Sequence, residues 1–387
     1  MPKPTQILFV NSTSEIGGAD IDLLLICSHL QRDRYEPKVV LPHAGPLCGE
    51  FSSRGIPLIY LDPAPLKRFI TAAQILSYPW RVGRAAWALF RLIRQEQVDI
   101  VHVNTAVLPA AGLAARLAGV KCVWHIREIE ILQRSIVIGA LLRWCIWACA
   151  DRIIAISEAV GKGLGAPARD TLQVIYHGLD TTHFYPGAIN QAVRREFKIP
   201  AKAKVIGYIG RISPIKGLGY LITALGLIRR QYPETYLLLV GPVLGYQRHL
   251  EELHRLVEDQ NLTEWVIFSE ERQDIPEILR AVDVVVLPTV IPEGLGKVLL
   301  EGLACGKPVI ATNQGGPLEI LRDCAAARLV PPRDSTAIAQ ALQYFWELPP
   351  ARQQELSQEG YELVKQQHSM SKMIENLEEV YNSLLSS

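Results

Sequence analysis

Two carboxylates stand eight residues apart in a segment rich in glycine and leucine, 292–310. Glu293 lies in a Pro/Gly loop, and Glu301 lies inside the helix expected to follow that loop. At about 100° per residue the two need not share a helix face, so they are not an obvious acid–base pair across a bond to be cleaved. Each carboxylate can instead accept hydrogen bonds from a diol. Leucines surround Glu301, so we discount a merely solvated helical glutamate.

Basic residues and glycines that suit a diphosphate follow the expected strand 204–210. Arg211 and Lys216 stand between two glycines there; the arginine can grip a phosphate as a planar fork, and the lysine adds a point charge. The alternative is a solvated loop, and we favour phosphate binding. Gly294 and Gly296 leave the N-terminus of the helix after Glu293 open to an anion in a similar way.

Gly17 and Gly18 follow the first expected strand and precede an apolar helix, which would let backbone N–H groups approach an anion. An ordinary glycine turn explains them equally well. The pair is not part of a dinucleotide-binding G-x-G-x-x-G pattern, and no G-x-x-x-x-G-K-[ST] phosphate loop occurs in the chain.

Short apolar runs alternate with longer helical patterns, as in a parallel α/β sheet with crossover helices. The strand candidates are 6–11, 37–41, 58–61, 99–104, 121–125, 152–156, 173–176, 204–210, 236–240, 265–268, 283–288, 308–312 and 327–330. The clearest helical patterns are 21–30, 74–95, 106–118, 131–150, 219–230, 248–259, 275–281, 297–304, 336–346, 351–367 and 371–385. Residues 180–204 lack periodicity and contain two prolines, so they are predicted to connect two domains. We therefore predict two doubly wound α/β domains facing one cleft, with ligands beyond the carboxyl ends of the strands.

Composition excludes several classes of protein. The 387 residues carry 40 Lys+Arg against 39 Asp+Glu, a net charge of +1, so there is no overall basic field for nucleic acid. Only four consecutive apolar residues precede Asn11, too few for a secretory signal, and Arg143 interrupts the longest apolar stretch, 136–150. The seven cysteines are scattered and odd in number, as in a protein with reduced thiols. We expect a cytoplasmic protein without a metal site.

In several motifs the chain resembles the family-four retaining glycosyltransferases (group 1), which have the GT-B fold of two Rossmann-like domains. The E-x7-E spacing from Glu293 to Glu301 is similar to that family's signature, and Gly210-Arg-Ile-Ser-Pro-Ile-Lys-Gly217 is similar to its diphosphate loop. Asn313-Gln-Gly-Gly-Pro-Leu-Glu319 resembles the family's GG-x-P-E turn, with proline shifted by one place. Val174-Ile-Tyr-His-Gly-Leu-Asp180 resembles its N-G-V-D junction, with His177 in place of Asn. The motifs follow the family's order over essentially the whole chain.

The resemblance implies an acceptor domain over 1–185, completed by helix 371–387, and a donor domain over 200–370. It also implies that Glu301 holds the ribose of a nucleotide and that Glu293 contacts the donor sugar. His125, at the end of strand 121–125, matches a family histidine near the reaction centre, although a lone histidine at a strand end is more often structural. The implied donor-binding residues are Gly17, Gly18, Arg211, Lys216, Glu293, Gly294, Leu295, Gly296 and Glu301. The implied catalytic residues are His125, Arg211, Lys216 and Glu293.

The implied reaction is transfer of a hexosyl group from a nucleotide-diphosphate sugar with retention of anomeric configuration, by front-face departure and attack. Arg211, Lys216 and helix N–H groups would stabilise the leaving diphosphate without a metal or other cofactor. The sequence identifies neither the base nor the sugar. The acceptor could be a lipid-linked saccharide, a polysaccharide end or a small molecule, as in polysaccharide biosynthesis.

Residues 80–95 contain four arginines and two tryptophans that fall within one arc of about 140° on a helical wheel. Arginine with tryptophan on one helix face suits the headgroup region of an anionic membrane. The alternative is a solvated arginine face. Peripheral membrane contact through 80–95 is therefore a hypothesis.

Three other functions compete with the transferase. A sugar-nucleotide epimerase can share the fold, but the E-x7-E segment and the glycine turn argue against it. A dinucleotide-dependent oxidoreductase would need the missing glycine fingerprint. A non-catalytic sugar-nucleotide-binding subunit would be expected to lose Glu301, Lys216 or Arg211, and all three are present.

Overall fold

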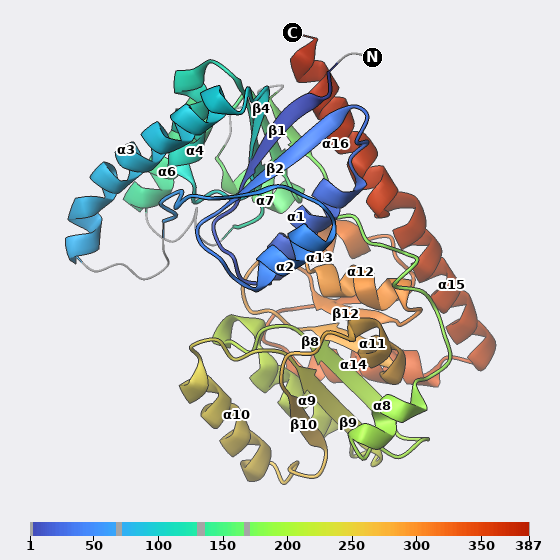
Figure 1. Ribbon diagram of the computed structural model, residues 1–387. Helices are drawn as coiled ribbons and strands as arrows, with labels where there is room; N and C mark the ends of the chain where they lie inside the picture. The colour runs from blue at the N-terminus through green and yellow to red at the C-terminus, as the bar shows by residue number, and fades with distance from the viewer. Residues whose placement is uncertain (1–2, 67–71, 130–135, 166–170, 387) are drawn as a thin grey trace. The chain divides into compact units, whose positions relative to one another are not determined.

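The computed structural model describes residues 3–66, 72–129, 136–165 and 171–386 (Figure 1). The chain divides into two compact units: the first comprises Met1–Gly178 with Ser371–Ser387, and the second comprises Leu179–Met370. Each unit is built on its own parallel sheet flanked by helices. The predicted fold class, two doubly wound α/β domains, is confirmed.

The first unit has a seven-stranded sheet in the order β3-β2-β1-β4-β5-β6-β7. All of its neighbouring strands pair in parallel. The strands are β1 (Thr5–Val10), β2 (Tyr35–Leu41), β3 (Leu58–Tyr60), β4 (Ile100–Val103), β5 (Lys121–Ile126), β6 (Arg152–Ala155) and β7 (Leu172–Val174). Every residue of β4 is buried, so its sequence does not alternate between apolar and polar residues: apart from His102 it is apolar throughout.

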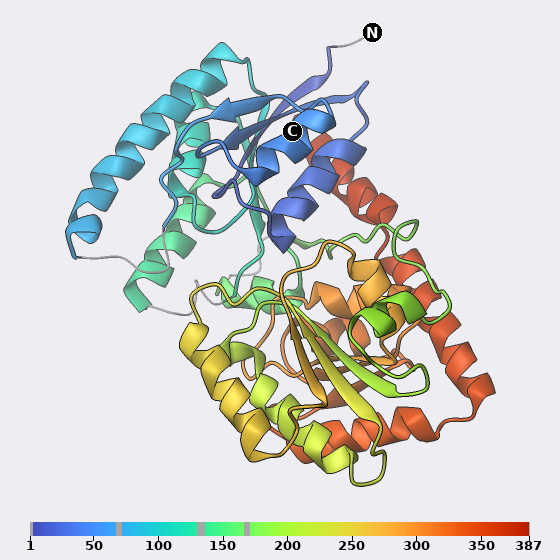
Figure 2. The same cartoon turned by 60° about the horizontal axis from the view of Figure 1, so that its bottom comes forward.

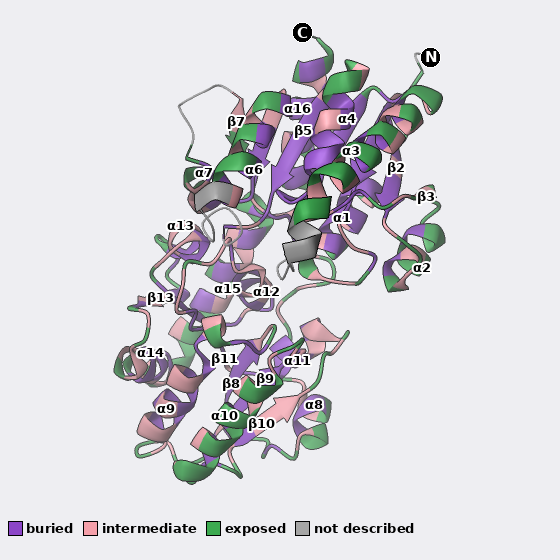
Figure 3. Cartoon of the chain, turned by 90° about the vertical axis from the view of Figure 1, so that its left-hand side faces the viewer, coloured by how far each residue is buried: buried purple, intermediate pink, exposed green. Residues whose placement is uncertain are grey.

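Two sets of helices accompany this sheet. The helices α3 (Ala72–Gln95), α4 (Pro109–Ala118) and α6 (Ile136–Cys149) form one layer, with α4 in contact with both others and with β4 and β5. Figure 3 looks onto this layer. The remaining helices are α1 (Gly18–His29), α2 (Pro46–Ser53), α7 (Glu158–Gly163) and α16 (Met370–Leu385). The expected helix 131–150 is present from Ile136, and residues 131–135 lie outside the described part.

The second unit has a six-stranded sheet in the order β10-β9-β8-β11-β12-β13, again with parallel neighbours. The strands are β8 (Lys204–Ile209), β9 (Thr235–Val240), β10 (Val266–Ser269), β11 (Val284–Leu287), β12 (Val309–Thr312) and β13 (Ala327–Val330). Strands β8, β9 and β10 run side by side in Figure 2.

The helices of the second unit pack in two groups. One group is α9 (Leu218–Ile228), α10 (Gln247–Asp259) and α14 (Ser335–Glu347). The other is α8 (Gln191–Glu196), α11 (Ile275–Ala281), α12 (Lys297–Ala304) and α15 (Pro350–Gln367). A 3₁₀ turn, Pro214–Lys216, follows β8, and α13 (Gly316–Leu321) follows β12. The segment 180–204, predicted as an irregular connector, contains α8 and packs within the second unit through the buried side chain of Arg194.

Strand order fixes where each unit can bind a ligand. Chain order reverses between β1 and β4 in the first sheet and between β8 and β11 in the second. In open α/β sheets, the loops at the carboxyl ends of such strands diverge and leave a crevice for ligands. The segments after β1 and β4, and after β8 and β11, are therefore where functional residues are expected.

Candidate active site

The loop after β8 is packed onto the end of β11. The backbone N–H of Val290 donates to the carbonyl of Ile215 at 2.9 Å. Gly217 has a φ of 67°, and a Cβ there would lie 2.1 Å from the carbonyl oxygen of Pro288. Only glycine allows this approach, so the fold itself requires one of the two glycines that flank the basic residues.

This packing brings two of the predicted site residues into contact. The Nζ of Lys216 donates to Oε2 of Glu293, across 77 positions of sequence. Both side chains are only partly exposed, at 14% and 24%. The ion pair leaves the other carboxylate oxygen and two ammonium protons available for hydroxyl or phosphate groups. Arg211, which precedes this turn, is exposed to solvent.

The loop that carries Glu293 is held by the glycine turn after β12. Glu293 forms a β-bridge with Gly315, and the Gly316 N–H donates to the Glu293 carbonyl at 2.9 Å. A Cβ on Gly315 would lie 2.3 Å from that carbonyl oxygen, and one on Gly316 would lie 2.4 Å from the Gly294 carbonyl oxygen. The two glycine motifs seen separately in the sequence are thus one structural unit.

Helix α12 begins directly after this loop. Gly296 is its N-cap with a φ of 82°, and α12 then extends from Lys297 to Ala304 as expected. Glu301 is half-buried on the second turn. Leu295 is 2% exposed, so its backbone, not its side chain, is the part that a donor could touch.

Gly17 and Gly18 end the segment that follows β1, and α1 begins there with Gly17 as the N-cap. Nothing lies within 4 Å of a Cβ built on Gly18, whose residue is exposed. Neither packing nor φ therefore requires glycine at position 18. An open helix N-terminus of this kind suits an anion.

The first unit also holds a buried polar cluster that the sequence reading missed. Arg127 donates to Oδ1 of Asn104 from both Nε (3.1 Å) and Nη2 (3.0 Å), and from Nη1 to Oδ2 of Asp22 at 3.2 Å. The side chains of Arg127 and Asp22 are 3% and 1% exposed. His177, the junction residue that replaces asparagine in the family motif, contacts the same Asp22 carboxylate. Burial lowers the pKa of Arg127, opposed by Asp22.

The cluster continues from Asn104 to the start of α1. Asn104 donates to Oδ1 of Asn11 at 3.0 Å, and Asn11 donates to Oδ1 of Asp20 at 2.7 Å. A signal for it was present in the sequence, because Asn11, Asn104 and Arg127 are each the first residue after a buried strand. Polar residues in that position are where an α/β sheet places ligands.

His125 lies on β5 beside this cluster, and its side chain is 1% exposed. The Tyr381 hydroxyl lies 2.7 Å from Nδ1 of His102, and Nε2 of His102 lies 3.3 Å from Nδ1 of His125. In one direction, the Tyr381 hydroxyl donates to Nδ1 of His102, and Nε2–H of His102 donates to Nδ1 of His125. Among these three side chains, only Nε2–H of His125 then lacks a partner. In the opposite direction, the hydroxyl proton of Tyr381 would lack a partner as well. Burial, helped by Arg127, lowers the pKa values of both histidines, to about 3 for His102. His125 is therefore a neutral imidazole with a buried, unpaired donor.

In the part of the chain that the structure describes, no three His, Cys, Asp or Glu residues are grouped so as to hold a metal ion. Among the same residues, no helix is both long and apolar enough to cross a lipid bilayer. All seven cysteines are free thiols.

Two family profiles match consecutive parts of the sequence. The profile described as Glycosyl transferases group 1 matches residues 190–363, and the one described as Glycosyltransferase Family 4 matches residues 16–183. The matched ranges correspond closely to the second unit and to the main part of the first unit.

Curated proteins that are similar in sequence to this chain are named as glycosyltransferases. The D-inositol 3-phosphate glycosyltransferase of Corynebacterium kroppenstedtii is 28% identical over 71% of this chain and 59% of its own length. The GDP-mannose-dependent alpha-(1-6)-phosphatidylinositol monomannoside mannosyltransferase of Mycolicibacterium smegmatis is 30% identical over 65% of this chain and 68% of its own length. Over the first several relatives, the chain thus spans between about one third and two thirds of their length.

Among solved structures, Anabaena Alr3699/HepE in complex with UDP superposes with a TM-score of 0.84 over 98% of this chain and all of its own. Its sequence identity is 23%, so the comparison bears on the fold.

Proposed function

The chain belongs to the group 1 glycosyltransferases, and on that premise we propose that it is a retaining enzyme that moves a hexosyl group from a nucleotide-diphosphate sugar to a hydroxyl of a saccharide, lipid-linked or small-molecule acceptor. We place this activity in the cytoplasm, in the assembly of a polysaccharide or glycolipid. The observation that carries the proposal is the Lys216–Glu293 pair. It joins a basic loop that suits a diphosphate to a carboxylate that suits sugar hydroxyls, and it lies beside the strand-order reversal between β8 and β11.

In the proposed reaction, the bond between the anomeric carbon and the diphosphate oxygen breaks, and the acceptor oxygen bonds to the same face of that carbon. The acceptor proton passes to the departing phosphate. Arg211, Lys216 and the N–H groups at the start of α12 would stabilise the developing negative charge. Glu293 would orient the sugar, and Glu301 would accept two hydrogen bonds from the ribose. Retention would be tested by comparing the anomeric configuration of product and donor by NMR.

Gly18 and His125, which belong to the first unit, would contact the donor. The open space above Gly18 supports a role for its backbone N–H beside an anion. The unpaired Nε2–H of His125 supports a hydrogen bond to a bound ligand, since burying a donor without a partner costs about 1–3 kcal/mol. No metal or cofactor is needed for these roles.

The first experiment is Glu301→Ala. We expect the variant to lose the thermal stabilisation that the wild type gains from one nucleoside diphosphate among UDP, GDP and ADP, and to lose transfer, measured as nucleoside diphosphate released with donor and acceptor present. CMP and NAD serve as unrelated ligands. The melting temperature without ligand should stay near that of the wild type.

Glu362→Ala is the matched control, since Glu362 is also a half-buried glutamate on a helix, α15. It should bind and turn over like the wild type. Wild-type-like turnover by Glu301→Ala would refute the role given to Glu301, and stabilisation by NAD alone would refute the transferase.

A further inference from the structure

The layer of α3, α4 and α6 carries a charge pattern unlike the rest of the chain. The three helices contain six arginines and no aspartate, glutamate or lysine, although the whole sequence is nearly neutral. Two carboxylates near α3 in the described part of the chain are already paired: Asp62 with Arg81 at 3.3 Å, and Glu96 with Lys38 at 2.7 Å. The outer side of this layer is therefore positive.

The same layer exposes the large apolar side chains that a soluble surface usually hides. Three of the seven tryptophans of the chain are exposed, and all three lie here: Trp80 (66%) and Trp87 (59%) on α3, and Trp144 (69%) on α6. Leu76 on α3 and Leu141 on α6 are exposed by 84% and 61%. Exposed turns of both helices can be followed in Figure 3.

The inner face of α3 shows why these side chains point outward. Ala85, Leu89 and Ile93 are buried, and they alternate at helical spacing with the exposed residues. Trp80 also stacks under a charge: the guanidinium of Arg84 lies 5.0 Å from its ring centroid. An aromatic ring beneath a cation is an arrangement that suits a membrane interface, where one end is apolar and the other contacts headgroups.

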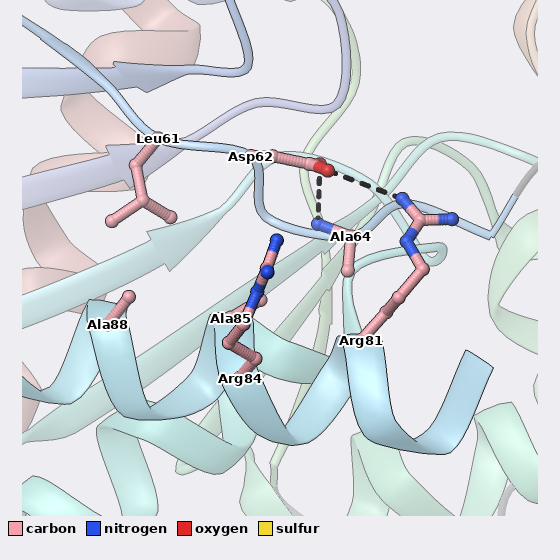
Figure 4. Close-up of a pocket in the computed structure, with 7 residues that line it drawn as sticks. All are labelled: Leu61, Asp62, Ala64, Arg81, Arg84, Ala85 and Ala88. Atoms are coloured by element: carbon pink, nitrogen blue, oxygen red, sulfur yellow. Dashed lines mark hydrogen bonds and ion pairs between the residues drawn. The ribbon is translucent and has the colours of Figure 1, made fainter. Parts of the chain in front are cut away.

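A cavity of about 160 Å³ opens beside these residues (Figure 4). It is lined by Leu61, Asp62, Ala64, Arg81, Arg84, Ala85 and Ala88. Arg81 reaches across it to Asp62, and Arg84 extends from the same side of α3. The Arg81 guanidinium is paired with Asp62 there, so Arg84 is the group that would meet a phosphate at the surface.

We propose that this arginine–tryptophan face, comprising Leu76, Trp80, Arg84, Trp87, Arg91 and Arg94 of α3 with Leu141 and Trp144 of α6, docks flat onto an anionic lipid bilayer, with Arg84 receiving a headgroup phosphate at the mouth of the cavity. Exposed leucines and tryptophans insert at the headgroup–acyl boundary, and arginines pair with anionic headgroups. Both helices follow strands, β3 and β5, so their N-terminal ends lie toward the carboxyl ends of the strands, where α/β sheets bind ligands.

The charge pattern of this face distinguishes between three possible partners: a second copy of the chain, a nucleic acid and an anionic bilayer. A second copy of the chain would place arginines against arginines in a symmetric contact, and Asp62, the carboxylate beside the cavity, is already paired with Arg81. Nucleic acid would satisfy the arginines but would leave Leu76 and Leu141 exposed to water. An anionic bilayer satisfies both the charged and the apolar groups.

The test is flotation of the purified full-length protein with vesicles of phosphatidylcholine alone or with about 30% phosphatidylglycerol. We expect binding only to the anionic vesicles, weakened in 1 M salt, where the Debye length is about 3 Å. Arg84→Gln/Arg91→Gln/Arg94→Gln should weaken binding at least about tenfold, given the attraction of each arginine to an anionic surface. Leu76→Gln/Trp80→Gln/Trp144→Gln should weaken it by a similar factor and reduce quenching of tryptophan fluorescence by brominated lipids, since only Trp87 remains on the face.

Two controls remove exposed groups of the same kinds, arginine and leucine, elsewhere. Arg248→Gln/Arg255→Gln/Arg322→Gln takes three exposed arginines from the second unit, and Leu385→Gln takes an exposed leucine from α16. Both should bind like the wild type. The proposal is overturned if the wild type fails to float, if the apolar variant binds as well as the wild type, or if the face instead mediates a dimer detected by light scattering. None of these measurements depends on transferase activity, so a failure here would not bear on the proposed function, which is tested separately.

Discussion

Asp20 shows at the scale of one side chain what burying the polar cluster costs. It is 7% exposed, and burial raises the pKa of its carboxyl to about 6, although the hydrogen bond from Asn11 and the charge of Arg127 oppose the shift. Since the folded pKa exceeds the ordinary value of 3.8, the folded state holds this proton more tightly than the unfolded chain does. The stabilisation that comes from the proton is present below pH 4 and is lost as pH rises through about 6.

Asp20→Asn isolates this effect because the amide oxygen can still accept from Asn11. The free energy of unfolding of the wild type minus that of the variant should fall by about 2 kcal/mol between pH 4 and pH 7. Subtraction removes the opposing contribution of His102, whose lowered pKa makes stability fall as pH drops below 6.5. Urea unfolding of both proteins over that range measures the difference. A difference that does not change with pH would mean that Asp20 is ionised in the folded protein as easily as in water.

Tyr381→Phe removes the first donor of the Tyr381–His102–His125 chain without removing its ring. Leaving Nδ1 of His102 without a partner should lower the unfolding free energy by about 1–3 kcal/mol. It should also release His125 from a single tautomer, which side-chain ¹⁵N shifts would report. Tyr344→Phe, at a partly exposed ring, is the control and should change neither quantity. An unchanged tautomer of His125 would show that Tyr381 does not fix it.

At the scale of elements, the glycine turn Gly315–Gly316 positions the loop that carries Glu293. Gly316→Ala would place a Cβ 2.4 Å from the Gly294 carbonyl oxygen, so the loop must shift. We expect a loss of about 1–3 kcal/mol in stability, in line with overpacked sites, and at least about tenfold lower turnover as Glu293 moves.

Gly49→Ala is the matched control for that substitution. Gly49 lies on the exposed side of α2 with nothing within 4 Å, so alanine there should be neutral or stabilising by up to about 1 kcal/mol. Thermal unfolding and initial rates measure both variants. Unchanged turnover in Gly316→Ala would show that the turn supports the fold without positioning Glu293.

The sequence predicted elements better than it predicted contacts. All thirteen expected strands are present, because parallel strands buried on both faces appear as unbroken apolar runs between helical patterns. It missed α8, whose six residues are too few to show a period. The Lys216–Glu293 pair and the Arg127–Asp22–His177 cluster depend on loops that meet only in the folded sheet. No local spacing could reveal them, although the position of Arg127 directly after β5 was a signal available in advance.

At the scale of the whole molecule, the first unit is discontinuous and the second is continuous in sequence. Helix α16 buries Met373, Leu377, Val380, Tyr381 and Leu384, each at most 3% exposed. At about 1.5–3 kcal/mol per buried side chain, the helix contributes roughly as much as the 5–15 kcal/mol by which a domain is usually stable. The first unit should therefore not fold without it.

Three fragments test this. Residues 179–370 should give a dispersed ¹H–¹⁵N spectrum and a cooperative melt, and 1–178 alone should give neither. Fusing 371–387 to 1–178 through a flexible linker should restore both. A folded 1–178 fragment would contradict the contribution assigned to α16.

The position of α16 in the sequence also affects the protein during its own synthesis. All 192 residues of the second unit are made between the two segments of the first. At roughly 5–20 residues per second, a ribosome needs about 10–40 s to traverse them. For that interval the nascent first unit displays the apolar surface that α16 will cover, long enough for a chaperone to bind it. The unit that begins first is thus the one that matures last.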